Sequence, residues 1–342
     1  MSDRTMKQKS SRLLDLILCA VLFGLSHPAV TGSEAGFRSL LEGSDLGGWD
    51  GDKRLWSIKD GVITGRTTAD PPLKANTFLI WRKGMLDDFE LRFSYRILGG
   101  NSGVQYRSKD LGNWSVGGYQ ADLEAGQTYS GILYEEKGRG ILAERGQKTV
   151  VDETGKVKAV GSVGNSAELQ AAIRHEDWND YVIVARGNHL IHKINGNVTV
   201  DVRDNQIEKR SRSGILALQL HVGPPMKVQF KNLRLKRLKL ETEKKIVLVA
   251  GRPSHAPGDH EFNAGVQLLH QSLKDQPGVL SAFYLNGWPS DPSAFDNADA
   301  IVFYMDGGSE HPVIQGDHLD ILAGLMKKGV GLAFLHYALE VP

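Results

Sequence analysis

Short runs of alternating apolar and polar residues, separated by turns that contain glycine, recur from Gly36 to about Leu238. Alternation with a period of two places successive side chains on opposite faces of a strand. Most of the 39 glycines of the chain lie between short apolar runs, and glycine accepts the positive φ angles that tight turns need. Because this region contains few credible helices, the pattern predicts one all-β domain of two packed sheets.

Local signals place turns and one irregularity in this domain. Asp60-Gly61 and Asn195-Gly196 each separate two alternating runs, and both dipeptides suit the turn of a two-residue hairpin. The apolar phase of the run from Val228 to Leu235 shifts by one residue, which predicts a β-bulge near Asn232. Residues 150–172 are rich in Gly, Lys, Val and Ser, so we expect a loop there with a short helical turn near 166–173.

Polar side chains form rows along three of the predicted strands. The rows comprise Gln105 and Arg107 on the first strand, Gln120, Asp122 and Glu124 on the second, and Gln219 and His221 on the third. Apolar residues, such as Ala121 and Leu123, occupy the opposite faces. Rows that share a concave face would form a sugar-sized polar groove. The alternative is that they form the solvated side of an antiparallel sheet.

The size and charge of the chain limit its class. A length of 342 residues is typical of about two domains. Hydrophobic residues make up 41% and charged residues 24% of the chain, which is ordinary for a soluble globular protein. A net charge of +1 argues against a nucleic-acid-binding protein, which usually carries a basic surface.

The first 32 residues have the pattern of a secretory signal. Four basic residues precede the apolar run from Leu13 to Leu25, which only Asp15 interrupts and which is short for a membrane span. They are Arg4, Lys7, Lys9 and Arg12. An uncleaved anchor is the alternative. Cleavage would remove Cys19, the only cysteine, so disulfides would not stabilise the mature protein. We therefore expect a periplasmic or secreted protein with no membrane association after cleavage.

The first domain resembles the 3-keto-disaccharide hydrolase family. The resemblance spans about two hundred residues and rests on many segments in the same order: Phe37 to Trp49, Trp56 to Ile63, Asn101 to Arg107, Gly118-Tyr119, Thr128 to Tyr134, Trp178-Asn179, Asn195-Gly196, Leu218 to His221 and Val228 to Leu233. It implies a concanavalin-like two-sheet jelly roll over residues 36–238. It also implies action on disaccharides or glycosides whose C3 hydroxyl has been oxidised to a ketone.

The residues of the polar rows include groups that could catalyse a reaction of this substrate class. A C3 ketone acidifies the C2 proton, so a base can remove it before the anomeric group leaves by β-elimination and water adds to the glycal. The reaction needs a base, a donor to the enolate oxygen and an acid at the leaving oxygen. The candidate catalytic residues are Asp122, Glu124 and His221 as base or acid and Arg107 as the electrophilic donor. The candidate substrate-binding residues are Gln105, Gln120, Gln219, Tyr119 and Asn101.

The chain departs from related sequences at one position that bears on the mechanism. Family members resemble Glu-x-Gln where this chain has Gln120-Ala121-Asp122. Glucanases of the implied fold place their nucleophilic glutamate at the position of Gln120, and an amide cannot attack an anomeric carbon. Retaining hydrolysis with two carboxylates is therefore disfavoured, and elimination is favoured. Glu135 and Glu136 are reserve candidates for acid or base.

Residues 244–342 follow a different pattern. Ile246 to Ala250 is a continuous apolar run, typical of a parallel strand covered on both faces. Predicted helices over about 262–273 and 319–328 alternate with further strands, which indicates a doubly wound, flavodoxin-like α/β fold. Because only four strands and two helices are predicted before Pro342, we expect this α/β domain to be incomplete.

This second half resembles the trehalose-utilisation (ThuA-like) family, which is related to class I glutamine amidotransferases. The resemblance rests on Ser254-His255, Asp259 to Glu261, Gly287 to Pro289, Asp306 to Gly308 and Gly329 to His336. Amidotransferases carry a cysteine where this chain has His336, so thiol amidase chemistry is excluded. His255, His260, Glu261, Asp306 and His336 lie at predicted carboxyl ends of strands, where such folds bind ligands. They form either a metal or sugar site or caps of helices and turns.

Three classes of function remain open from the sequence. The first is an exported hydrolase or lyase that cleaves 3-keto-disaccharides or 3-keto-glycosides. The second is a non-catalytic carbohydrate-binding module attached to the ThuA-like domain, and the third is an interaction domain without sugar chemistry. The expected partner is a small carbohydrate rather than a nucleic acid. No cofactor is required by the pattern, and a divalent metal is the one candidate.

Overall fold

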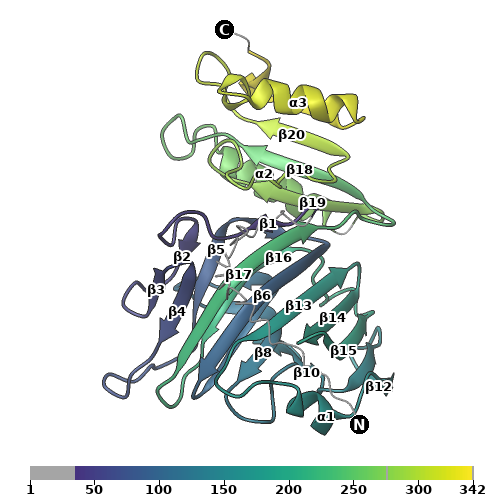
Figure 1. Ribbon diagram of the computed structural model, residues 1–342. Helices are drawn as coiled ribbons and strands as arrows, with labels where there is room; N and C mark the ends of the chain where they lie inside the picture. Colours follow the sequence, from purple (N-terminus) through teal and green to yellow (C-terminus); the bar gives the residue numbers. More distant parts are fainter. Residues whose placement is uncertain (1–34, 275, 341–342) are drawn as a thin grey trace, which may run out of the picture. The chain divides into compact units, whose positions relative to one another are not determined.

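The computed structural model describes residues 35–274 and 276–340, so the predicted signal segment, residues 1–32, lies outside the described residues. Two sheets built from β1 to β17 form the first domain (Figure 1). Their strands are β1 (Arg38–Ser39), β2 (Trp49–Asp50), β3 (Trp56–Lys59), β4 (Val62–Arg66), β5 (Thr77–Leu86), β6 (Phe89–Leu98), β7 (Asn101–Asp110), β8 (Val116–Glu124), β9 (Leu133–Glu136), β10 (Gly140–Ala143), β11 (Gln147–Val151), β12 (Val157–Ser162), β13 (Asn179–Arg186), β14 (His189–Ile194), β15 (Asn197–Asp204), β16 (Gly214–Leu220) and β17 (Lys227–Arg237).

The two sheets pack face to face, as the sequence predicts. Ten strands form one sheet, in the order β12-β11-β15-β14-β13-β6-β17-β4-β3 with β1 paired to β17. Seven form the other, in the order β10-β9-β8-β7-β16-β5-β2. One buried cluster joins them: it contains Phe93 and Tyr181 of the first sheet, whose rings stack at 5.2 Å, and Leu79 and Leu218 of the second. The apolar faces of both sheets are thus buried against each other.

The predicted turns and the bulge are confirmed. Asp60 and Gly61 have φ angles of 51° and 72° between β3 and β4, and Asn195 and Gly196 have 49° and 84° between β14 and β15. Two successive positive φ angles are the mark of the predicted hairpin turn. Asn232 has a φ of 56° where the pairing of β17 with β6 shifts register. Local residue chemistry alone therefore specifies these three features.

The prediction of a loop over residues 150–172 is wrong in part. The short helix α1 (Ser166–Ala171) is present, and the side chain of Asn165 caps it. However, β11 and β12 pair as an antiparallel hairpin, and β11 also pairs in parallel with β15. All six residues of β12 are exposed, so the strand has no buried face that alternation could reveal. Pairing to a neighbour, rather than burial, forms this edge strand.

The C-terminal region is a parallel sheet covered by helices on both faces. Its elements are β18 (Lys244–Ala250), α2 (Phe262–Leu273), β19 (Val279–Tyr284), β20 (Ala300–Tyr304), the 3₁₀ turn η1 (Pro312–Ile314), α3 (His318–Lys327), β21 (Gly331–Leu335) and the 3₁₀ turn η2 (His336–Leu339). The strand order is β19-β18-β20-β21, with all pairs parallel. Phe262 of α2 packs with Leu248 on one face, and Leu322 of α3 packs with Val249 on the other.

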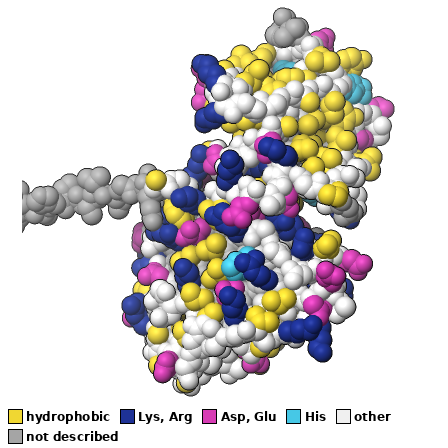
Figure 2. Space-filling model, turned by 90° about the vertical axis from the view of Figure 1, so that its right-hand side faces the viewer, with side chains coloured by type: hydrophobic (Ala, Val, Ile, Leu, Met, Phe, Trp, Pro, Cys, Tyr) yellow, Lys and Arg dark blue, Asp and Glu magenta, His cyan; other side chains and the backbone are white. Residues whose placement is uncertain are grey.

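This region leaves apolar side chains exposed. Figure 2 shows hydrophobic side chains gathered over it, whereas charged groups are mixed across the sandwich. The side chains of Leu319, Met326 and Leu339 are each more than half exposed, and β21 alternates between half-buried and exposed positions. These side chains give the C-terminal region an exposed apolar surface.

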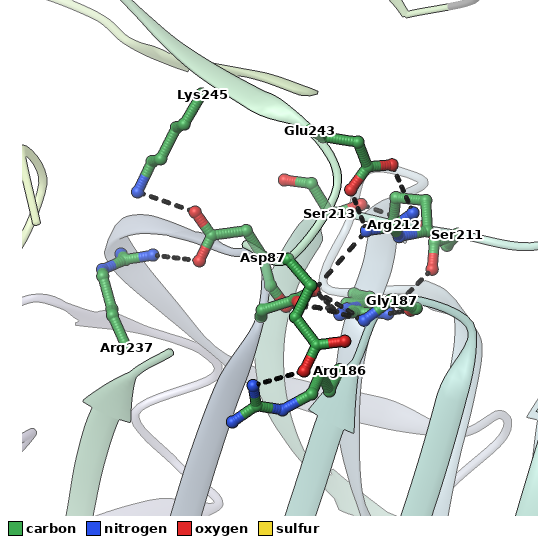
Figure 3. A network of polar contacts seen from close by, with 12 residues as sticks. Asp87, Arg186, Gly187, Ser211, Arg212, Ser213, Arg237, Glu243 and Lys245 are labelled. Carbon is green, nitrogen blue, oxygen red and sulfur yellow. Dashed lines mark hydrogen bonds and ion pairs between the residues drawn. The ribbon is translucent and has the colours of Figure 1, made fainter. Parts of the chain in front are cut away.

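A buried network of charges links the end of the sandwich to the start of the parallel sheet (Figure 3). Asp87 lies between β5 and β6 and pairs with Lys245 of β18 at 2.7 Å and with Arg237 of β17 at 3.1 Å. Arg237 also bonds Asp291 at 2.7 Å. Burial would raise the pKa of Asp87, but the charges of Lys245 and Arg237 outweigh it and hold the pKa below its ordinary value. These ion pairs connect Asp87 and Arg237 of the sandwich to Lys245 and Asp291 at the junction.

Candidate functional site

Strand β8 divides its side chains between the core and a groove. Tyr119, Ala121 and Leu123 belong to the buried cluster between the sheets, whereas Asp122 and Glu124 line a groove on the opposite face of the same strand. The period of two that the sequence shows here is therefore real, and it is the physical origin of the site.

The groove has a volume of about 730 Å³. It is built on the outer face of the seven-stranded sheet by β8, β9, the start of β7 and the loop that follows β16. Its walls are Asn76, Gly100, Asn101, Gln120, Asp122, Glu124, Tyr129, Ile132, Tyr134, Glu136, Ile141, His221, Val222, Gly223 and Pro224. Three carboxyl groups, one imidazole and two phenols thus converge on a space that fits a small carbohydrate.

Asp122 is the most perturbed acid of the groove. Its side chain is only 6% exposed, and the Nε2 amide of Gln120 donates a hydrogen bond to Oδ1. Burial raises the pKa of Asp122 to about 7, the hydrogen bond from Gln120 partly opposes the rise, and the negative charges of Glu136 and Glu124 add to it. A carboxyl group with this pKa exchanges protons near neutral pH, as a general base or acid must.

The other two carboxyl groups are held by backbone or amide donors. Glu124 accepts a hydrogen bond from the backbone N–H of Thr128. Glu136 accepts a hydrogen bond from Nδ2 of Asn76 at 3.1 Å, and Oδ1 of Asn76 accepts the backbone N–H of Val222 at 2.9 Å. Asn76 therefore connects Glu136 to the loop that carries His221.

The orientation of His221 follows from its neighbour. Nδ1 lies 2.5 Å from the carbonyl oxygen of Val222, and a carbonyl oxygen can only accept a hydrogen bond. Nδ1 therefore carries the hydrogen, which leaves Nε2 of the neutral ring as an acceptor. This tautomer suits a residue that exchanges a proton through Nε2.

The three glutamines form a layer in which only one reaches the groove. Gln120 lines it, whereas Gln105 and Gln219 are fully buried behind it. The amides of Gln105 and Gln120 hydrogen-bond at 2.6 Å, and Nε2 of Gln120 lies 3.4 Å from Oε1 of Gln219. The expectation that Gln105 and Gln219 orient substrate hydroxyls directly is thus corrected, because they can act only through Gln120.

The structure removes Arg107 from the site. Its guanidinium is buried, donates to Asp88 and to the carbonyl oxygens of Asp87 and Gly187, each at 2.7 Å, and does not line the groove. Arg107 has a φ of 47°, and the pairing of β7 with β8 shifts register between Tyr106 and Lys109. This bulge breaks the alternation on which the prediction relied. Burial lowers the pKa of Arg107, but its ion pair marks a structural role.

Tyr119 is a second correction. Its ring is 1% exposed in the core, and its hydroxyl donates to Asp204 at 2.5 Å. It faces away from the groove because it shares the inward phase of Ala121. Tyr119 therefore holds the sandwich together and cannot touch a substrate there. Asn101, by contrast, lines the groove as expected.

Sequence reasoning missed two phenols and one amide. Tyr134 and Glu136 point into the groove from β9, whereas Glu135 points the other way and pairs with Arg139 at 2.6 Å. Burial raises the pKa of Tyr134, and the charges of Glu136 and Asp122 raise it further. The alternation of side chains along β9 could have shown that Glu136 shares the face of Tyr134 and that Glu135 lies on the opposite face. No sequence signal pointed to Tyr129 or Asn76, because both lie outside strands.

A second polar cluster lies at the carboxyl ends of the parallel strands. His255, His260 and Asp306 place their ligand atoms within 4.8 Å of one another. The ring of His336 packs on that of His260, with 4.5 Å between centroids. Glu261 lies outside this group, because its side chain accepts the backbone N–H of Gly258 at 2.7 Å and closes a turn.

Comparisons with known proteins agree with a carbohydrate-active domain. The family profile described as a 3-keto-alpha-glucoside-1,2-lyase-like domain matches residues 36–236, more than half of the chain. No curated protein matches the chain at a significant level. No helix within residues 35–274 and 276–340 has the length and hydropathy that a membrane crossing requires.

Solved structures are similar at low identity. Two are candidate glycosyl hydrolases of Parabacteroides distasonis: one is 17% identical over 59% of this chain and 99% of its own, with a TM-score of 0.39, and the other is 21% identical over 60% and 95%, with a TM-score of 0.40. A third is the carbohydrate-binding module CBM66 of Bacillus subtilis, 13% identical over 55% and 95%, with a TM-score of 0.37. These scores are too low to carry an argument about mechanism.

Proposed function

Since the chain belongs to the family of 3-keto-alpha-glucoside-1,2-lyase-like domains through residues 36–236, we propose that it cleaves 3-keto-glycosides by elimination, with Asp122 as the base. The observation that carries the proposal is a buried carboxyl group with a pKa of about 7 in the wall of a sugar-sized groove. Two further carboxyl groups, a histidine and two tyrosines surround the same space.

The reaction balances without an oxidant or a reductant. The carboxylate of Asp122 takes the C2 proton, and the charge passes to the oxygen at C3 as an enolate. The enolate then collapses to restore the ketone, a C1=C2 double bond forms, and the C1–O bond breaks. The leaving oxygen takes a proton and departs as an alcohol. Water then adds a hydroxyl group at C1 and a proton at C2, which yields the free 3-keto sugar.

The remaining roles follow from the groove. Nε2 of His221, in its protonated form, donates the proton to the leaving oxygen. Tyr134 takes the donor role that Arg107 cannot fill, because a phenol with a raised pKa keeps its hydrogen at neutral pH and can stabilise the enolate oxygen. Gln120 holds Asp122 through a hydrogen bond and, as an amide, cannot act as a nucleophile. These features favour elimination over two-carboxylate hydrolysis.

The test is turnover of a 4-nitrophenyl 3-keto-α-glucoside by the purified chain, followed by the release of nitrophenol. The matched substrate is the parent glucoside with a hydroxyl group at C3. We expect cleavage of the keto substrate alone and its loss in Asp122→Asn. Equal cleavage of both substrates, or full turnover by Asp122→Asn, would refute the proposal.

One observation favours a second function, a non-catalytic carbohydrate-binding module. Tyr129 is 44% exposed at the groove wall, and an exposed aromatic ring can stack on a pyranose. A module would bind the keto sugar without turnover, would tolerate Asp122→Asn and would lose binding in Tyr129→Ala. The same assay, combined with calorimetric titration, separates the two functions.

The proposal extends to export and domain organisation. The pattern of residues 1–32 supports secretion to the periplasm or beyond, and N-terminal sequencing of the protein recovered outside the cytoplasm tests it. Residues 36–238 are then the catalytic jelly roll of concanavalin-like topology. The strand order of residues 244–342 supports a flavodoxin-like domain related to the ThuA-like family.

A further inference from the structure

The parallel sheet brings two histidines and one aspartate together from separate parts of the chain. His255 and His260 lie in the loop after β18, and Asp306 follows β20. Both strands are neighbours in the sheet, so their carboxyl ends meet at one edge, where α/β folds bind ligands. Asp306 and Ser254 also line a hollow of about 480 Å³ beside this edge.

Two atoms of this cluster are buried and make no hydrogen bond. Nδ1 of His260 and Oδ1 of Asp306 make no hydrogen bond among the described residues, although both are shielded from solvent. They face each other at 3.3 Å. A buried polar atom without a partner is costly, and here two such atoms point at the same place.

This spacing is that of two ligands on one ion. A tetrahedral Zn²⁺ binds imidazole nitrogen and carboxylate oxygen at about 2.0–2.2 Å, which places two such ligand atoms about 3.3 Å apart. His255 lies close by: its ring centroid is 3.9 Å from that of His260, and its Nδ1 is 3.6 Å from Oδ2 of Asp306. A cation here would satisfy both orphaned atoms at once.

The surroundings hold the cluster in place. The hydroxyl group of Ser254 donates to Oδ2 of Asp306 and lies 2.9 Å from Nδ1 of His255. Such contacts orient metal-binding side chains from outside the ligand set. His260 has a left-handed φ of 50°, a conformation that a residue with a side chain adopts at some cost. In this conformation Nδ1 of His260 lies 3.3 Å from Oδ1 of Asp306.

We propose that His255, His260 and Asp306 bind a divalent transition-metal ion, with Zn²⁺ as the best fit. Two imidazoles and one carboxylate leave an open coordination position, as in catalytic zinc sites. The adjoining hollow gives an oxygen ligand access to that position. The ring of His336 packs on that of His260. His336 is not one of the proposed ligands, because its Nδ1 already accepts the backbone N–H of Tyr337 at 2.7 Å. This site is separate from the groove of the sandwich, and the proposal does not depend on the elimination reaction.

The test is calorimetric titration of the full-length, tag-free chain with Zn²⁺ after removal of metal with a chelator. We expect one ion per chain. We expect His260→Ala and Asp306→Asn to lower the affinity by more than about 100-fold, because changes outside the ligand set alone cost about 10- to 100-fold. The 3-keto-glycoside turnover of both variants should stay that of wild type.

The matched control is His189→Ala. His189 also faces an aspartate, but its Nε2 is satisfied by a 2.7 Å contact with Asp201, so this variant should bind Zn²⁺ like wild type. If His260→Ala fails to fold, His255→Gln serves instead, because the side chain of His255 is about half exposed. Absence of 1:1 binding by wild type, or unchanged affinity in the cluster variants, would overturn the proposal.

Discussion

Replacement of Asp122 by asparagine should stabilise the protein at neutral and alkaline pH. The pKa of Asp122 in the folded state is about 7, against an ordinary value of 3.8. The folded protein therefore binds more protons than the unfolded chain between these two values, so its free energy of unfolding falls as pH rises. Asparagine has nearly the same shape and does not ionise. Its Oδ1 still accepts the hydrogen bond from Gln120.

The size of the effect follows from the two pKa values. Each pH unit between them costs about 1.4 kcal/mol, so the difference of about three units gives a ceiling of about 4 kcal/mol. Wild type and Asp122→Asn should be equally stable near pH 3. They should diverge between pH 4 and 7 and stay separated by a constant amount above pH 8.

The assay is urea unfolding across this pH range, followed by tryptophan fluorescence. Five of the six tryptophans lie in the sandwich, so the signal reports mainly on the domain that contains Asp122. Glu153→Gln changes an exposed carboxyl group in the turn between β11 and β12 and should follow wild type. Parallel pH profiles of stability for wild type and Asp122→Asn would refute the burial argument. A decrease in the stability of Asp122→Asn relative to wild type as pH rises would also refute it.

Three further predictions concern the surroundings of this acid. Arg107→Ala should cost about 3–5 kcal/mol of stability, because it breaks a buried ion pair, while the protein that remains folded keeps its turnover. Gly103→Ala should shift the pH profile of kcat/KM to higher pH, because a Cβ at Gly103 would lie 2.5 Å from the side chain of Gln120 and displace the hydrogen bond that lowers the pKa of Asp122. Tyr134→Phe should lower kcat about 10- to 100-fold with little change in KM, because it removes one donor to the enolate.

Each of these outcomes has a clear opposite. A loss of turnover in Arg107→Ala at unchanged stability would return Arg107 to the catalytic machinery. A Gly103→Ala profile that coincides with wild type would remove Gln120 as a support of Asp122. A rise in KM alone for Tyr134→Phe would make Tyr134 a binding residue.

Local chemistry made much of the fold predictable. The two hairpin turns, the bulge at Asn232 and the helix α2 depend on neighbouring residues, so the sequence indicates them directly. The edge strand β12 escaped prediction because all its side chains are exposed. Its strand conformation depends on pairing with β11, which no local pattern encodes.

The candidate site was predictable only where alternation held. Asp122 and Glu124 keep the period of β8 and reach the groove together. The same two-residue alternation along β7 would place Arg107 in the groove, but the bulge after Tyr106 turns its side chain toward Asp88. Tyr129 and Asn76 come from loops, whose position depends on the whole fold.

The most direct test of the account is the rate of cleavage of a 3-keto-glycoside that carries deuterium at C2. If Asp122 removes this proton in the slow step, kcat/KM should fall several-fold relative to the substrate with hydrogen at C2. On the acidic side, wild-type kcat/KM should also rise with pH, with a midpoint near the pKa of about 7. Equal rates for the two substrates, with a pH profile that Asp122→Asn leaves unchanged, would contradict proton abstraction by Asp122.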